Sequence, residues 1–92
     1  IGGDVGASLD QLDRQMLRTT YQKTMETAPT NQAMTWSNPD SGNSGSVTAT
    51  RTYYTEATVC REYTQEIMVG GAKQQGYGTA CRMADGSWKI QG

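Results

Sequence analysis

The segment that most constrains the fold runs from Cys60 to Cys81, the only two cysteines in the chain, and carries the pair Gly70-Gly71 near its middle. β-prone residues flank the glycines on both sides, which is typical of a β-hairpin with a two-residue turn of type I′ or II′. Such a turn pairs the two residues next to the glycines, and this pair fixes every other cross-strand partner. The register then places Cys60 directly opposite Cys81.

This register favours a disulfide between the two cysteines. Paired positions in an antiparallel ladder alternate between hydrogen-bonded and non-hydrogen-bonded types, and Cys60 and Cys81 fall at a non-hydrogen-bonded pair. The Cα atoms there are ~4.5 Å apart, at the short end of the range for disulfides. We predict a cross-strand bond, with two reduced core cysteines as the alternative. Zinc would need further ligands, and the chain has no His and no other Cys.

The same register assigns the residues of the first hairpin strand to two faces of a sheet. One face carries Tyr63, Gln65, Ile67 and Val69. The opposite face carries Glu62, Thr64, Glu66 and Met68. The first face has the larger apolar surface, so we expect it to lie against the core. Gly78 stands opposite Tyr63, where it would either leave room for this ring or let the helix approach closely.

An amphipathic helix is predicted from Ser8 to Ala28, a segment without Gly or Pro that Pro29 ends. Ser8 would cap it, with Gln11 completing a capping box. Its apolar stripe consists of Leu9, Leu12, Met16, Leu17, Thr20, Tyr21, Met25 and Ala28. We expect the stripe to pack on the core face of the sheet, with Leu12 and Met16 buried.

The charged residues of this helix are interpreted as a solvated face. They include Asp10, Asp13, Arg14 and Lys23. Asp10 and Asp13 would also place negative charge at the positive end of the helix dipole.

Short β-prone runs separated by turn residues follow the helix. The runs cover residues 33–37, 46–54, 58–69, 72–83 and 88–91. Strands joined by short turns pair with their neighbours, and a helix can then cover one face of the sheet. We predict an α+β domain over residues 8–92, with one N-terminal helix packed on an antiparallel meander of about five strands. Residues 1–7 would be the end of a glycine-rich segment.

Composition excludes several classes of function. The eight basic and nine acidic residues give a net charge of −1, and no basic tract exceeds a single Lys or Arg. Nucleic-acid binding is therefore not expected. The longest apolar run, Ile67 to Val69, is far short of the roughly 20 residues that span a bilayer.

No constellation of residues predicts catalysis. Without His the commonest general base is missing, and no motif positions a pair of carboxylates. We therefore expect a protein that is not an enzyme, with no catalytic residues, no cofactor and no metal. The candidate ligand-contact aromatics are Trp36, Tyr53, Tyr54 and Trp88. Because the chain has no Phe, these residues are also needed to build the core.

Three segments carry a resemblance to a known family. They are "GGDVGASLDQLDRQ", "WSNPDSGNSGSVTATRTY" and "CREYTQEIMVGGAKQQGYGTACRMADGSWKI". They resemble the C-terminal domain of the 17 kDa surface antigen family, glycine-zipper outer-membrane lipoproteins of Gram-negative bacteria. The resemblance implies an upstream lipidated Cys and a glycine zipper whose last turn would be residues 1–6. An oxidising periplasm also agrees with the predicted disulfide.

These observations predict a non-catalytic periplasmic or surface domain of an outer-membrane lipoprotein, with a structural or interaction role in the cell envelope. The expected partners are envelope proteins or peptidoglycan, and the outer membrane through the upstream lipid anchor. Association into a homo-oligomer is a further expectation. The alternative is a periplasmic binder of peptidoglycan, of a sugar or of a hydrolase such as lysozyme.

Overall fold

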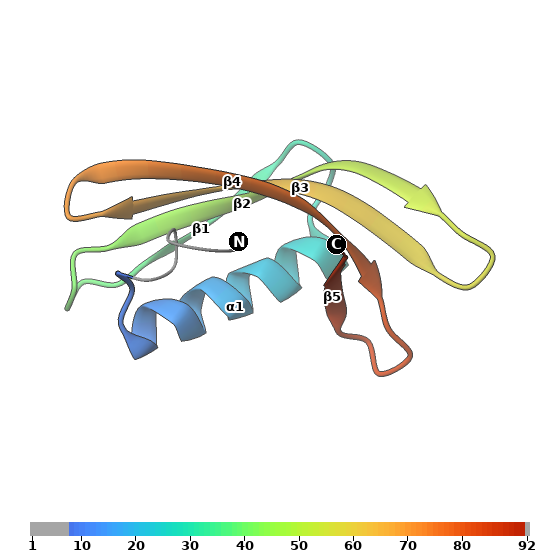
Figure 1. The fold of residues 1–92 in the computed structure, drawn as a ribbon, viewed down its shortest axis with the longest axis horizontal. Helices are drawn as coiled ribbons and strands as arrows, with labels where there is room; N and C mark the ends of the chain where they lie inside the picture. Colours follow the sequence, from blue (N-terminus) through green and yellow to red (C-terminus); the bar gives the residue numbers. More distant parts are fainter. Residues whose placement is uncertain (1–7, 92) are drawn as a thin grey trace.

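The fold is one helix followed by a five-stranded antiparallel sheet. The computed structural model describes residues 8–91 of the chain. The elements are α1 (Gln11–Thr27), β1 (Ala33–Ser37), β2 (Ser44–Tyr54), β3 (Val59–Val69), β4 (Ala72–Arg82) and β5 (Trp88–Gln91). The strands are neighbours in sequence order, and the sheet arches over α1 (Figure 1). The predicted α+β meander is confirmed, while the predicted glycine-rich segment, residues 1–7, lies outside the described residues.

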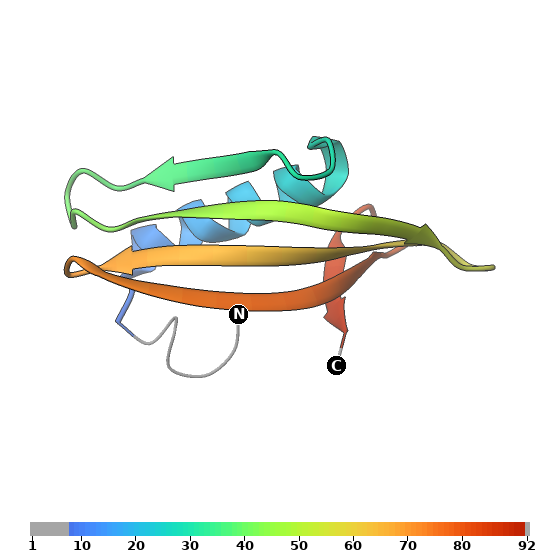
Figure 2. The same cartoon turned by 90° about the horizontal axis from the view of Figure 1, so that it is seen from above.

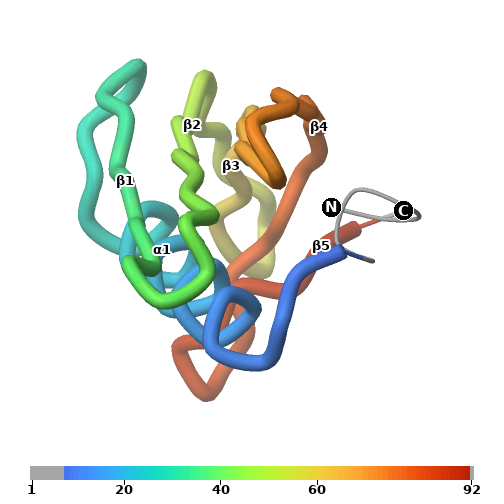
Figure 3. The backbone as a smooth tube through the Cα atoms, turned by 90° about the vertical axis from the view of Figure 1, so that its left-hand side faces the viewer, coloured from blue at the N-terminus to red at the C-terminus, as the bar shows by residue number. Residues whose placement is uncertain are grey.

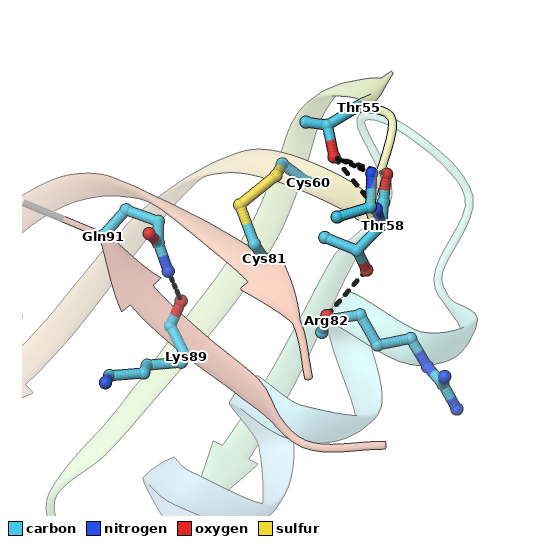
Figure 4. Close-up of a disulfide and its surroundings, with 8 residues drawn as sticks. Thr55, Thr58, Cys60, Cys81, Arg82, Lys89 and Gln91 are labelled. Carbon is cyan, nitrogen blue, oxygen red and sulfur yellow. Dashed lines mark hydrogen bonds between the residues drawn. A yellow bond between two sulfur atoms is a disulfide. The ribbon is translucent and has the colours of Figure 1, made fainter. Parts of the chain in front are cut away.

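The β3–β4 hairpin has the predicted register. Gly70 and Gly71 have φ angles of 58° and 81°, the positive values that a type I′ turn requires at both central positions. Cys60 pairs with Cys81 in the ladder, and the two residues form a disulfide with a Cα–Cα distance of 4.0 Å (Figure 4). The predicted cross-strand disulfide is therefore confirmed, and it holds β3 to β4 at the end of the hairpin far from the turn.

The predicted N-cap is wrong, because α1 begins after Asp10 and not after Ser8. The Asp10 carboxylate accepts a hydrogen bond from the Asp13 backbone N–H at 2.8 Å. The Asp10 N–H in turn donates to Asp13 Oδ2 at 3.1 Å, which completes a capping box. Leu9, which is only 4% exposed, packs with Trp36 before the helix begins. The packing of Leu9 thus places the N-cap at Asp10, and the capping box predicted from Ser8 and Gln11 does not form.

The predicted helix stripe is confirmed in its C-terminal half and wrong at Leu12. Tyr21 and Met25 are buried, and Met16 is half-buried. Leu12 is 40% exposed, whereas its neighbour Asp13 is completely buried. The contacts of Asp13 fix the rotation of the helix about its axis, and this rotation leaves Leu12 partly exposed to solvent.

Two apolar clusters form the core between α1 and the sheet. The larger consists of Tyr21, Met25, Val47, Ala49, Tyr63, Ala80 and Trp88. The smaller consists of Leu9, Trp36 and Ile67. The rings of Tyr21 and Tyr63 meet edge to face with centroids 5.5 Å apart, a favourable arrangement. A Cβ at Gly78 would lie 2.8 Å from the Tyr63 hydroxyl, so the predicted room for this ring is present.

The helix does not cover the sheet evenly. It contacts β1 and β2 and lies beneath these strands. β4 belongs to the same sheet but lies farther from the helix (Figures 2 and 3). β5 is joined to α1, because the Tyr21 hydroxyl donates a hydrogen bond to the Trp88 carbonyl at 2.9 Å. Within residues 8–91, no helix is both long enough and apolar enough to cross a membrane.

Candidate binding surfaces

Asp13 is the centre of a buried polar cluster that joins the start of α1 to the β1–β2 loop. Its Oδ1 accepts hydrogen bonds from Asn38 Nδ2 at 2.8 Å and Ser41 Oγ at 2.7 Å. Its Oδ2 accepts a hydrogen bond from Asn43 Nδ2 at 2.8 Å, in addition to the Asp10 N–H. The interpretation of Asp13 as part of a solvated helix face is therefore wrong.

This environment keeps Asp13 ionised. Burial alone would raise the pKa of its carboxyl group, but hydrogen bonds from Asn43, Ser41 and Asn38 outweigh burial and lower the pKa to about 2. A general acid or base at neutral pH needs a pKa near the operating pH and a free position for substrate. The Asp13 carboxylate has neither, so its role is to attach the loop to the helix.

The four aromatic residues singled out from the sequence do not form a common site. Trp36 and Trp88 are 6% and 5% exposed and belong to the two core clusters. Tyr53 is half-buried and lies against the Arg51 guanidinium, with 4.9 Å between the Arg51 Cζ and the ring centroid. Tyr54 is 81% exposed near the end of β2. Ligand contact by these residues stays a prediction, and packing accounts for the two tryptophans.

A shallow groove of about 550 Å³ crosses the face of the sheet that points away from α1; we call it the outer-face groove. It is lined by Ala33, Ser46, Thr48, Thr64, Gln65, Glu66, Gln75, Gly76 and Tyr77. Hydroxyl and amide groups dominate this surface, and Tyr77 adds a ring that is 88% exposed. The groove thus combines an aromatic platform with several hydrogen-bonding groups.

Glu66 places a fixed negative charge in the outer-face groove. Gln75 Nε2 donates to Glu66 Oε1 at 2.8 Å, and Lys73 Nζ lies 3.4 Å from the same oxygen. The hydrogen bond from Gln75, followed by the charge of Lys73, lowers the pKa of Glu66. Glu66 is therefore an ionised acceptor at neutral pH.

A second groove, of about 430 Å³, lies between α1 and β5; we call it the α1–β5 groove. It is lined by Leu17, Arg18, Tyr21, Gln22, Gln65, Trp88, Lys89 and Ile90. Gln22 fixes one wall, because its side-chain amide donates to the Trp88 carbonyl at 3.1 Å and accepts from the Trp88 N–H at 2.9 Å. Apolar and aromatic side chains make up half of the lining residues, and Ile90 is 49% exposed.

Gln65 is the unusual polar residue of the α1–β5 groove. Its side chain is 3% exposed, and its Oε1 has no hydrogen-bond partner. A buried polar atom without a partner carries a desolvation cost and calls for an explanation. The α1–β5 groove therefore contains a buried acceptor that a bound donor group could satisfy.

The hairpin register predicts Gln65 on the core face, but no feature of the sequence marks Gln65 or Tyr77 as a candidate contact. One signal could have identified Asp13 as buried. It stands four residues after Leu9 and four before Leu17, which is a core position of an amphipathic helix. A charged residue at such a position indicates a buried polar partner.

Among residues 8–91, no three His, Cys, Asp or Glu side chains gather into a group that could hold a metal ion.

Comparison with known proteins gives consistent matches. The model of the 17 kDa outer membrane surface antigen family matches residues 23–89. A 17 kDa surface antigen of Rickettsia bellii (strain RML369-C) is 45% identical over 87 residues, which cover 94% of this chain and 55% of the relative. The 17 kDa surface antigen of Rickettsia prowazekii (strain Madrid E) is 47% identical over 82 residues, covering 88% and 52%. The chain thus spans about half the length of the curated relatives it matches. No solved structure matches it.

Proposed function

Because the chain belongs to the 17 kDa outer membrane surface antigen family, we propose that it is a non-catalytic interaction domain of a cell-envelope protein. The proposal includes attachment to the outer membrane through a lipidated cysteine and a glycine zipper upstream of this domain. The observation that carries it is the family match over residues 23–89. The two open grooves agree with a role in contact, since hydrogen bonds hold Glu66 and Gln75 in the outer-face groove and Gln22 in the α1–β5 groove.

The test compares an anchored and a soluble form of the protein in a strain that lacks the native gene. One form carries the lipidated upstream segment, and the other is secreted without it. Under envelope stress, we expect only the anchored form to rescue the strain that lacks the native gene. The reason is that an interaction domain attached to the membrane contacts its partners there. Rescue by the soluble form would indicate a diffusible binder or inhibitor. Hydrolysis of any envelope polymer by the purified domain would contradict the non-catalytic assignment.

A second candidate function is binding of peptidoglycan or another sugar at the outer-face groove. The observation that favours it is the exposed ring of Tyr77 beside the Gln75 amide and the hydroxyl groups of the neighbouring strands. Aromatic rings with a few convergent polar groups suit ligands that are apolar on one face and polar at their edges.

Two exposed tyrosines make a matched test of sugar binding. Tyr77 lines the outer-face groove, whereas Tyr54 is similarly exposed but does not line it. Sedimentation of the domain with purified peptidoglycan should decrease with Tyr77→Ala and stay unchanged with Tyr54→Ala. Equal binding by both variants would exclude this groove, and inhibition of lysozyme without peptidoglycan binding would favour a hydrolase as the partner.

A further inference from the structure

One edge of β4 is open over most of its length. β5 pairs with β4 only from Thr79 to Arg82, and no described strand pairs with residues 72–78 on that side. Hydrogen-bonded and non-hydrogen-bonded positions alternate from the turn that closes the hairpin. The backbone N–H and C=O groups of Lys73, Gln75 and Tyr77 therefore point away from β3, toward the open edge. Such an edge is a template for another strand.

The α1–β5 groove lies on the inner face of the sheet, where α1, Gln65 of β3 and residues 88–90 of β5 line it. Gln65 pairs with Gly76 across the ladder, so no side chain of β4 stands next to the Gln65 amide on that face. Ile90 pairs with Ala80 and belongs to the same face. A strand that followed β5 along the open edge would point alternate side chains into the groove.

Gln65 defines what such a strand would supply. Its Oε1 is buried without a partner, so a donor that enters the groove would gain a hydrogen bond without displacing one. The main-chain amides of an added strand face β4 in the plane of the sheet, so the donor would be a short hydroxyl side chain that points into the groove.

Two basic residues are among those that line the α1–β5 groove. Arg18 and Lys89 line it, both are exposed, and neither forms an ion pair with a described residue. Their charges contrast with the net charge of −1 of the whole chain. Charge complementarity at a rim selects the partner and speeds the encounter.

We propose that the open edge of β4 and the α1–β5 groove bind an extended acidic segment of a partner protein, which adds to the sheet as a strand. This mode of recognition obtains affinity from main-chain hydrogen bonds and specificity from alternate side chains. The inference rests on the proposed interaction function and names the chemistry of the partner.

Short peptides test this mode with the 92-residue chain. The probe is the blocked peptide Ac-ETVTVTE-NH2, and titration calorimetry measures its affinity. We expect the Lys analogue Ac-KTVTVTK-NH2 to bind at least about tenfold more weakly, and the difference to shrink at high salt. Two further analogues carry N-methyl groups on alternate sets of amides. Only one set should abolish binding, because only one set faces β4.

Matched variants assign the binding to this surface. Gln75→Pro removes an edge donor and should abolish binding, whereas Gln75→Ala, which removes the same side chain, should retain it. Reversal of Arg18 and Lys89 to Glu should weaken binding about tenfold, and Lys23→Glu, outside the groove, should not. Gln65→Leu should raise the melting temperature of the free protein and weaken peptide binding roughly three- to tenfold, since it removes an unpaired buried acceptor.

Several results would overturn the inference. They are equal effects of both N-methylated analogues, equal affinity of the Glu and Lys peptides, and no binding of the Glu peptide at millimolar concentration. A dimer in sedimentation equilibrium that Gln75→Pro dissociates and Gln75→Ala retains would assign the edge to a second copy of this chain instead. If the unchanged chain does not bind the Glu peptide but the anchored form still rescues the strain that lacks the native gene, this inference is rejected and the proposed function remains intact.

Discussion

At the scale of single residues, Asp13 links stability to pH. Its pKa is about 2 in the folded chain against an ordinary value of 3.8. A lowered folded-state pKa stabilises the protein above the unfolded-state pKa, and this contribution is lost as the pH falls from about 4 to about 2. We predict a loss on the order of 2 kcal/mol in the free energy of unfolding across this window. Urea unfolding followed by tryptophan fluorescence at several pH values would measure it.

The control for this prediction is Asp13→Asn. The amide has the size of the carboxyl group but turns an N–H toward the donors of Asn38, Ser41 and Asn43. We expect a cost of about 1–3 kcal/mol at neutral pH and a flatter acid profile. An equally steep acid profile in the variant would assign the effect to other carboxylates with lowered pKa values, such as Glu66 and Asp85.

At the scale of elements, we expect the Cys60–Cys81 disulfide to stabilise the β3–β4 hairpin. Cys60 and Cys81 are 21 residues apart in sequence, and closing a loop of this size stabilises a protein by roughly 3 kcal/mol in the chain-entropy model. We predict that Cys60→Ala with Cys81→Ala lowers the free energy of unfolding by about this amount. The oxidised parent, the reduced parent and the double variant would be compared by urea unfolding. Equal stability of the oxidised and reduced parent would contradict the prediction.

The rotation of α1 gives a second prediction at this scale. Leu12 is 40% exposed and Met25 is 1% exposed, although both belong to the stripe predicted from the sequence. Met25→Ala should cost about 2–5 kcal/mol, whereas Leu12→Ala should cost less than about 1 kcal/mol. Thermal unfolding of the two variants checks the orientation of the helix. A larger cost for Leu12→Ala would mean that the helix is rotated toward the sequence-based stripe.

The elements differ in how far the sequence predicts them. Strand positions and the Cys60–Cys81 pair were predictable because Gly70-Gly71 fixes the hairpin register by local turn chemistry. The helix start was not predicted, since it depends on the packing of Leu9 with Trp36, which is distant in sequence. The spacing of Asp13 from Leu9 and Leu17 was a signal of burial, but its donors lie 25 to 30 residues away in the β1–β2 loop and no local pattern identifies them. The two grooves were also not predictable. The outer-face groove is formed by three neighbouring strands and the end of a fourth, and the α1–β5 groove by the position of α1 beneath the sheet, and no local pattern encodes either arrangement (Figure 3).

At the scale of the whole molecule, α1 is attached to the sheet at both ends by charged groups. Asp13 binds the β1–β2 loop at the N-terminal end. At the C-terminal end, Arg61 of β3 donates through Nη1 to the carbonyl oxygens of Thr24 and Met25, both at 3.0 Å. An anion near the N-terminus and a cation at the C-terminus both complement the helix dipole. The two attachments thus act on opposite ends of one element.

The last prediction is that these two attachments contribute independently. Arg61→Lys keeps the charge, but one ammonium group cannot replace the geometry of the guanidinium, so a cost of about 1–2 kcal/mol is expected. Positions 13 and 24 are roughly 16 Å apart along the helix at 1.5 Å per residue, and the packing of Tyr21 on Tyr63 holds the segment between them. Changes at such separated sites add within about 0.5 kcal/mol. The double variant Asp13→Asn with Arg61→Lys should therefore lose the sum of the two single costs in urea unfolding. If the double variant has the same free energy of unfolding as the less stable single variant, release of one end of the helix already frees the whole helix.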